Sequence, residues 1–262
     1  MKIKVMSVFG TRPEAIKMLP LVRRIQETPA LESIVCITAQ HREMLDHVLR
    51  TFGVTADYDL NLMMPRQTLT DITTRVLEGL AGVLAQAQPD IVLVHGDTTT
   101  SFAAALAAFY QKIPVGHVEA GLRTYNMYSP FPEEINRNLT SKLATLHFAP
   151  AELNRENLAR ENITEGVHVT GNTVIDALLS IVREGYTFQD EDLRAMQFGQ
   201  GRTILLTAHR RENLGQPMRN IFAPCWRSPT GTRTCASFTP CTRIRRYASP
   251  PGSCWASIRA ST

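Results

Sequence analysis

Clusters of polar side chains that could do acid-base chemistry follow several apolar segments of this 262-residue sequence. The run HGDTTT begins at His95 and includes Asp97, and the run GHVEAGLRT includes His117 and Glu119. Alternate residues of a strand share a face, so the two His-x-acid pairs could form a metal site. Histidine on a buried strand is more often a core residue, and no third ligand set accompanies these pairs, so we predict no metal.

Two further runs carry groups suited to catalysis. SPFPEE places Glu133 and Glu134 in the first turn of an expected helix, where they complement the helix dipole. Carboxylates on a loop stiffened by two prolines would also suit general acid-base catalysis. AHRREN, which contains His209 and two arginines, would suit a nucleotide diphosphate or form an ordinary polar loop.

The run GTRPE, residues 10–14, follows the first apolar segment. Thr11 and Glu14 have the spacing of a capping box and predict the start of a helix. The free N–H groups of a helix start can bind phosphate, and Arg12 and Lys17 could add positive charge there. The alternative is plain capping with both cations in solvent.

These clusters follow short apolar segments that alternate with helical patterns. Apolar residues spaced by three and four over 69–84 are typical of a helix, and 135–144 and 174–186 also predict helices. The alternation predicts an α/β fold with a doubly wound parallel sheet, in which ligands bind outside the carboxyl ends of the strands. The expected strands are Ile3–Phe9, Ser33–Ile37, Ile91–His95, Val115–Val118, Thr145–Phe148, Val167–Thr170 and Thr203–Thr207.

Composition divides the chain into three parts: a first domain over 1–171, the start of a second over 172–222, and a tail over 223–262. The tail holds six of the 28 basic residues and no acidic ones, which leaves 22 basic against 24 acidic residues before it. The near-neutral body gives no reason to expect nucleic acid or membrane partners. Four of the five cysteines lie in the tail, and their spacing matches no metal site. Cys36 lies in an apolar run, so we expect it to be a buried free thiol. We also expect the protein to be cytoplasmic.

Seven motifs in this order resemble those of the non-hydrolysing bacterial UDP-N-acetylglucosamine 2-epimerases. The motifs are FGTRPEAIKM, TAQHREMLD, LVHGDTTT, GHVEAGLRT, SPFPEEINR, TGNTVIDAL and TAHRRENLG. The resemblance implies a GT-B architecture of two Rossmann-like domains and interconversion of UDP-N-acetylglucosamine and UDP-N-acetylmannosamine through a 2-acetamidoglucal, without NAD or metal. It also implies a homodimer.

The resemblance also implies roles for single residues. Asp97, Glu119 and Glu133 are the acid-base candidates, and His209 would assist at the diphosphate. Arg12 and Lys17 would hold substrate together with Asp97, Glu119 and His209. A hydrolysing epimerase, a GT-B glycosyltransferase and a sugar-nucleotide binding module remain alternatives.

The family pattern stops near Phe222. In a shifted reading frame, residues 238–256 permit YPVHPNPAVREPAWELLG, which resembles the next family motif. The sequence therefore predicts an out-of-frame tail, a frayed region after Phe222 and an inactive chain.

Overall fold

The computed structural model describes residues 2–38, 42–62, 64, 66–195 and 215–220. The chain divides into two compact units, Met1–Arg183 and Glu184–Thr262. Among the helices of the described residues, none is long and apolar enough to cross a membrane. The predicted strand 203–207, His209 and the tail from 223 onward lie outside the described residues.

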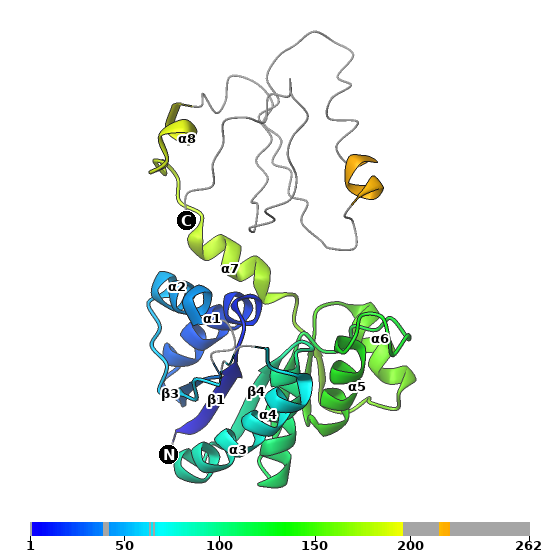
Figure 1. Ribbon diagram of the computed structural model, residues 1–262. Coiled ribbons are helices and arrows are strands. Elements are labelled where there is room, and N and C mark those ends of the chain that lie inside the picture. The colour runs from blue at the N-terminus through cyan, green and yellow to red at the C-terminus, as the bar shows by residue number, and fades with distance from the viewer. Residues whose placement is uncertain (1, 39–41, 63, 65, 196–214, 221–262) are drawn as a thin grey trace. The chain divides into compact units, whose positions relative to one another are not determined.

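A parallel sheet organises the first unit (Figure 1). Its spatial order is β3-β2-β1-β4-β5-β6-β7, and every neighbouring pair is parallel. The order reverses direction between β1 and β4, which is the topological switch point of a doubly wound fold. The strands are β1 Ile3–Phe9, β2 Leu31–Ile37, β3 Tyr58–Asp59, β4 Ile91–His95, β5 Val115–Val118, β6 Leu146–Ala149 and β7 Val167–Val169.

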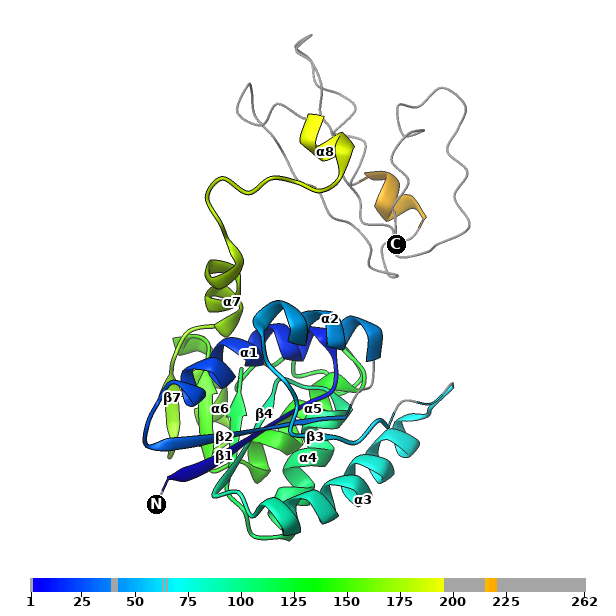
Figure 2. The same cartoon turned by 90° about the vertical axis from the view of Figure 1, so that its left-hand side faces the viewer.

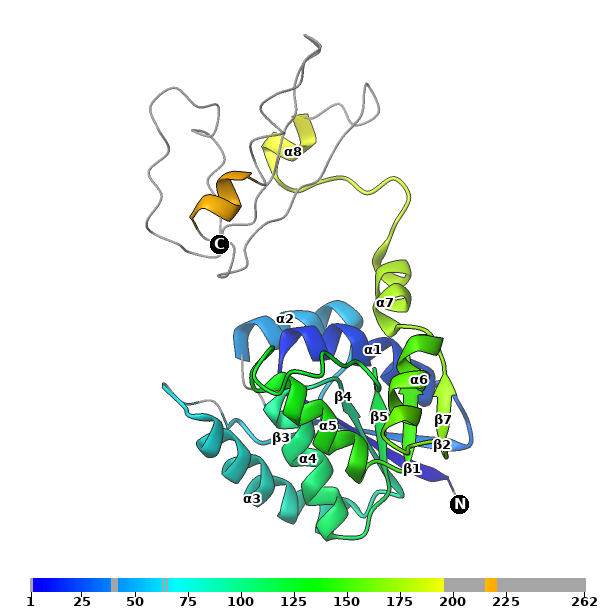
Figure 3. The same cartoon turned by 90° about the vertical axis from the view of Figure 1, so that its right-hand side faces the viewer.

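Helices cover both faces of this sheet, as the sequence predicted. One core cluster joins the sheet to α1, α2 and α7, and the other joins it to α3 and α4, so these two groups lie on opposite sides (Figures 2 and 3). The helices are α1 Arg12–Gln26, α2 Arg42–Phe52, α3 Leu69–Ala87, α4 Thr99–Tyr110, α5 Glu133–Leu143, α6 Glu152–Arg160, α7 Thr173–Ile181 and α8 Glu191–Ala195.

The period of two along β1 explains why the sheet needs both layers. Val5 and Phe9 face the first cluster, whereas Met6 and Val8 face the second, and all four side chains are buried. A strand that is apolar on both faces is stable only when both faces are covered.

The predicted element bounds differ from the observed ones in informative places. The two-residue strand β3 was missed, because two residues give no periodicity to detect. The predicted helix 174–186 ends at Ile181, and Val182 has extended backbone angles. Residues 216–220 are also helical. The predicted boundary at 171 precedes α7, whereas α7 groups with the first unit; the domain assignment of the complete fold stays a prediction.

Candidate active site

Glu14 joins the loops that follow β1 and β4 at the switch point. Its Oε2 accepts from the backbone N–H groups of Gly10 at 3.0 Å and Thr11 at 2.7 Å, which completes the predicted capping box. Its Oε1 accepts from the hydroxyls of Thr98 at 2.6 Å and Ser101 at 2.9 Å, both at the start of α4. The side chain is buried, so this carboxylate is a structural clamp between two loops and not an exposed base.

Lys17 and Glu119, predicted as substrate-binding residues, lie together. Lys17 Nζ is 2.5 Å from Glu119 Oε2, and Asn172 Nδ2 donates to the same oxygen at 2.9 Å. Glu119 follows β5 with φ of +64°, a left-handed conformation that is uncommon for a residue with a side chain. A helix, a strand end and the residue preceding α7 thus converge on one carboxylate.

Asp97 lies after β4 in an ion pair with Arg137 of α5. Asn136 Nδ2 also donates to the backbone oxygen of Asp97 at 3.0 Å. Burial raises the pKa of Asp97 above its ordinary value; Arg137 opposes this shift, and the charges of Glu133 and Glu119 add to it. Glu119 and Glu133 therefore lie close enough to Asp97 for their charges to affect its pKa.

The loop before α5 is held by the second glutamate of the SPFPEE run. Glu134 accepts from the backbone N–H groups of Thr124 and Tyr125 at 2.9 to 3.1 Å, and lies 3.5 Å from Arg137 Nη1. Glu134 is 2% exposed, whereas Glu133 is only partly buried. The two adjacent carboxylates thus divide their roles: Glu134 fixes the loop, and Glu133 remains available to a ligand.

The two strand histidines are buried in the core. His117 Nε2 lies 2.7 Å from the Gly96 carbonyl, and burial lowers its pKa to about 3. His95 Nε2 is buried and 3.8 Å from Glu119 Oε2, and burial lowers the pKa of this imidazole as well. Among the described residues, no group of three or more His, Cys, Asp and Glu side chains could hold a metal ion.

The structure therefore brings four predicted site residues together: Lys17, Asp97, Glu119 and Glu133. Arg12 is exposed in the first turn of α1, with no hydrogen bond or ion pair to another described residue. His209 lies outside the described residues, so its role stays a prediction.

Sequence reasoning missed the groups that hold these residues in place. They are Asn136, Arg137, Asn172 and the second function of Glu14. The SPFPEEINR and TGNTVIDAL motifs contain three of them, but only the folded chain shows which carboxylate each one contacts.

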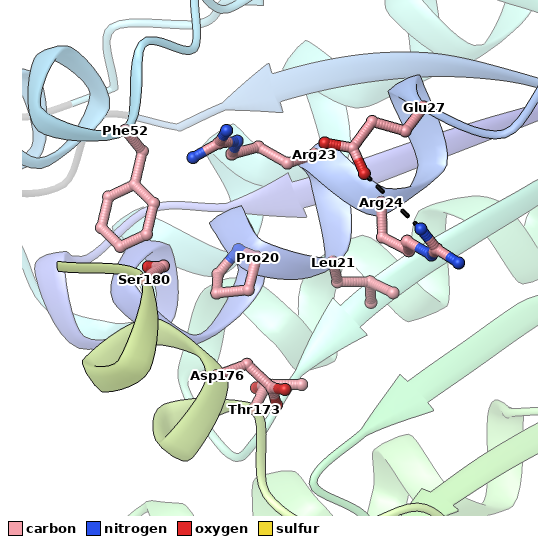
Figure 4. Close-up of a pocket in the computed structure, with 9 residues that line it drawn as sticks. All are labelled: Pro20, Leu21, Arg23, Arg24, Glu27, Phe52, Thr173, Asp176 and Ser180. Carbon is pink, nitrogen blue, oxygen red and sulfur yellow. Dashed lines mark ion pairs between the residues drawn. The ribbon is translucent and has the colours of Figure 1, made fainter. Parts of the chain in front are cut away.

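An open pocket of about 520 Å³ lies elsewhere, between α1 and α7 (Figure 4). None of the predicted site residues lines it. Its lining residues are Pro20, Leu21, Arg23, Arg24, Glu27, Phe52, Thr173, Asp176 and Ser180. It lacks the carboxylate cluster, so we place the candidate site at the carboxyl ends of β1, β4 and β5.

Fold and site together define a doubly wound α/β protein with acid-base groups at the topological switch point. The chain belongs to the UDP-N-acetylglucosamine 2-epimerase family, whose model matches residues 23–232. The UDP-N-acetylglucosamine 2-epimerase of Bacillus subtilis (strain 168) is 58% identical over 222 residues, covering 84% of this chain and 57% of the relative. The Escherichia coli (strain K12) enzyme is 54% identical over 233 residues, covering 84% and 60%.

Solved structures agree with this membership and confirm the predicted GT-B fold class. A putative UDP-N-acetylglucosamine 2-epimerase from Listeria monocytogenes has a TM-score of 0.77 at 56% identity, covering 86% of this chain and 59% of its own. The Neisseria meningitidis enzyme, solved with UDP-GlcNAc bound, has a TM-score of 0.66 at 63% identity, covering 68% and 49%. The chain spans 57 to 60% of the length of the curated relatives named above.

Proposed function

We propose that this chain carries the amino-terminal catalytic machinery for interconverting UDP-N-acetylglucosamine and UDP-N-acetylmannosamine. The observation that supports this most directly is the cluster of Asp97, Glu119 and Glu133 at the switch point, with Lys17 and Arg137 as its cations. Proton transfer at a sugar carbon needs carboxyl groups of this kind in a partly buried place.

The reaction has two balanced halves. A base takes the proton from C2 of the sugar while the bond from C1 to the UDP oxygen breaks, which gives 2-acetamidoglucal and UDP. The UDP oxygen then forms a bond to C1 again, and an acid delivers a proton to the opposite face of C2. Two proton-transfer groups are therefore needed, one for each face.

The surroundings of Asp97 suit one of these groups. Its raised pKa brings the carboxyl closer to neutral pH, where it exchanges protons most effectively. Glu119 and Glu133 are the candidates for the opposite face.

The start of α1 suits the diphosphate. Arg12 is exposed there at the positive end of the helix dipole, and Lys17 lies five residues further along the same helix. His209 is proposed to act on the diphosphate from the second domain, which we assign to residues 172–222. The ligands of solved relatives support a nucleotide at this fold: the Methanocaldococcus jannaschii enzyme is described in complex with UDP-GlcNAc and UDP.

Finer properties belong to the same proposal. We assign the non-hydrolysing reaction, without NAD or metal, because the motifs at 93–100 and 207–215 resemble that group. We also propose a cytoplasmic homodimer, with a free Cys36 compatible with a reducing compartment.

The test is deuterium incorporation at C2 of UDP-N-acetylglucosamine in deuterium oxide, followed by proton NMR. Two proteins are compared: the 262-residue chain, and a chimera in which residues 1–222 continue into the carboxyl-terminal part of the Bacillus subtilis relative. We expect exchange in the chimera and its loss in the chimera carrying Asp97→Asn. Absence of exchange in the unsubstituted, folded chimera would refute the proposal.

Product analysis of the same reaction separates the rivals. Free N-acetylmannosamine in stoichiometric yield would show the hydrolysing reaction. Sugar transfer to an added acceptor without exchange at C2 would show a glycosyltransferase.

A further inference from the structure

One amide side chain contacts both a proposed catalytic carboxylate and the last helix of the first unit. Asn172 Nδ2 donates to Glu119 Oε2 at 2.9 Å. Its Oδ1 accepts from the backbone N–H of Val174 at 3.0 Å, and Asn172 is the N-cap residue of α7. The donor end thus serves Glu119, and the acceptor end serves the helix.

The same carboxylate oxygen is held from a second helix. Lys17 of α1 lies 2.5 Å from Glu119 Oε2, with the Lys17 side chain 24% exposed. α7 packs near α1, where Ala177 is 2% exposed within the same core cluster as the buried face of α1. The end of β5, α1 and α7 therefore form a closed set of contacts around Glu119.

The two oxygens of Glu119 differ in their surroundings. Within the described part of the chain, each of its hydrogen bonds and ion pairs is made by Oε2. The left-handed backbone of Glu119 is a costly conformation that persists when surrounding contacts hold it. A contact that restrains Oε2 also sets the direction in which Oε1 points.

We propose that Asn172 is a positioning residue for the epimerisation: it fixes Oε2 of Glu119, so that Oε1 is the oxygen presented to the substrate. The orientation of Glu119 is then tied to the start of α7. The catalytic part of this inference rests on the proposed function, whereas the contact itself does not. Asn172 acts through Glu119 and not on the substrate.

Three substitutions separate the two ends of this amide. Asn172→Ser keeps a capping hydroxyl but is too short to reach Glu119. Asn172→Asp keeps the capping oxygen and replaces the donor with a second negative charge. Asn172→Ala removes both contacts, and the exchange protection of the first-turn amides of α7 should then fall about fivefold.

The first test uses the 262-residue chain and needs no turnover. In proton–nitrogen correlation spectra, the side-chain amide of Asn172, assigned by its loss in Asn172→Ser, should change its position when Glu119 is replaced in Glu119→Gln. The other charged or titratable groups facing Glu119 are Lys17 of α1 and, at the end of β4, His95 and Asp97. An Asn172 resonance unchanged by Glu119→Gln at every pH would overturn the inference.

The second test measures turnover in the chimera described above. Asn172→Ser should lower kcat about 10- to 100-fold with KM within about threefold, because a misplaced catalytic group loses rate more than binding. Asn172→Asp should lower kcat similarly and move the acidic limb of its pH profile to higher pH, which a purely structural cap would not do. The control, Asn61→Gly at an exposed position whose positive φ suits glycine, should leave both constants unchanged.

The outcomes distinguish two failures. If the unsubstituted chimera shows no exchange at C2, the proposed function has failed, and the amide resonance still decides the contact. If the chimera turns over and Asn172→Ser retains the full kcat, the positioning role is wrong.

Discussion

The clamp formed by Glu14 makes a sharp prediction about stability. Replacement by Ala removes the acceptor of four hydrogen bonds that join the loops after β1 and β4. The two hydroxyls can find other partners: Thr98 and Ser101 lie 3.0 Å apart, and Ser101 Oγ is 2.5 Å from the carbonyl oxygen of His95. The backbone N–H groups of Gly10 and Thr11 cannot rotate toward another acceptor, so they are left without a hydrogen-bond partner.

The expected loss follows from those two groups. A buried N–H without an acceptor destabilises a protein by about 1–3 kcal/mol, and the Gly10 bond is buried whereas the Thr11 bond is only partly so. We therefore expect Glu14→Ala to lower the free energy of unfolding of the first unit by about 2–4 kcal/mol. That is a large share of the roughly 5–15 kcal/mol typical of a folded domain.

Glu14→Gln should cost less than half as much as Glu14→Ala. Its amide oxygen can accept from the two backbone N–H groups, while the NH₂ group faces hydroxyls that can rotate to accept from it. Urea denaturation followed by far-ultraviolet circular dichroism measures the free energy of unfolding of the unsubstituted chain, Glu14→Ala and Glu14→Gln. Glu78→Ala, at an exposed position of α3, is the control and should change stability by less than about 0.5 kcal/mol. A loss below about 1 kcal/mol in Glu14→Ala would refute the clamp.

Three other predictions concern activity and pH. Asp97→Asn in the chimera should lower kcat about 10²- to 10⁴-fold with the fold intact, and near-normal turnover in a rate assay would contradict its proton-transfer role. Arg12→Ala should leave the thermal midpoint of unfolding unchanged and weaken UDP binding, measured by calorimetry, about tenfold or more. A UDP affinity equal to that of the unsubstituted protein would show that Arg12 does not bind the nucleotide. Burial lowers the pKa of His117 to about 3 and that of His147 to about 4. As the pH falls, both imidazoles therefore bind a proton in the unfolded chain before they do so in the folded chain. Stability present above about pH 6.5 should therefore fall as the pH drops toward 4, and His117→Gln should flatten that dependence in urea titrations at several pH values.

Hydrophobic periodicity and local sequence motifs predicted most of the fold. Apolar strands alternating with helical patterns predicted the parallel sheet and its two helical layers, because burial on both faces leaves a readable sequence pattern. The capping box at Thr11 and Glu14 was also readable, since it depends on residues three positions apart. The short strand β3 and the end of α7 could not be predicted in this way. Two residues show no periodicity, and an apolar pattern can continue past the end of a helix.

By itself, the sequence determined which residue types follow which strands, and so identified Lys17, Asp97, Glu119 and Glu133 as candidates. Only the tertiary structure decided how those groups are held: Asp97 by Arg137, forty positions away, and Glu119 by Lys17 and Asn172 from two helices. The parallel crossovers bring the carboxyl ends of separate strands to one edge of the sheet. Contacts made there depend on strand order, which adjacent residues do not encode.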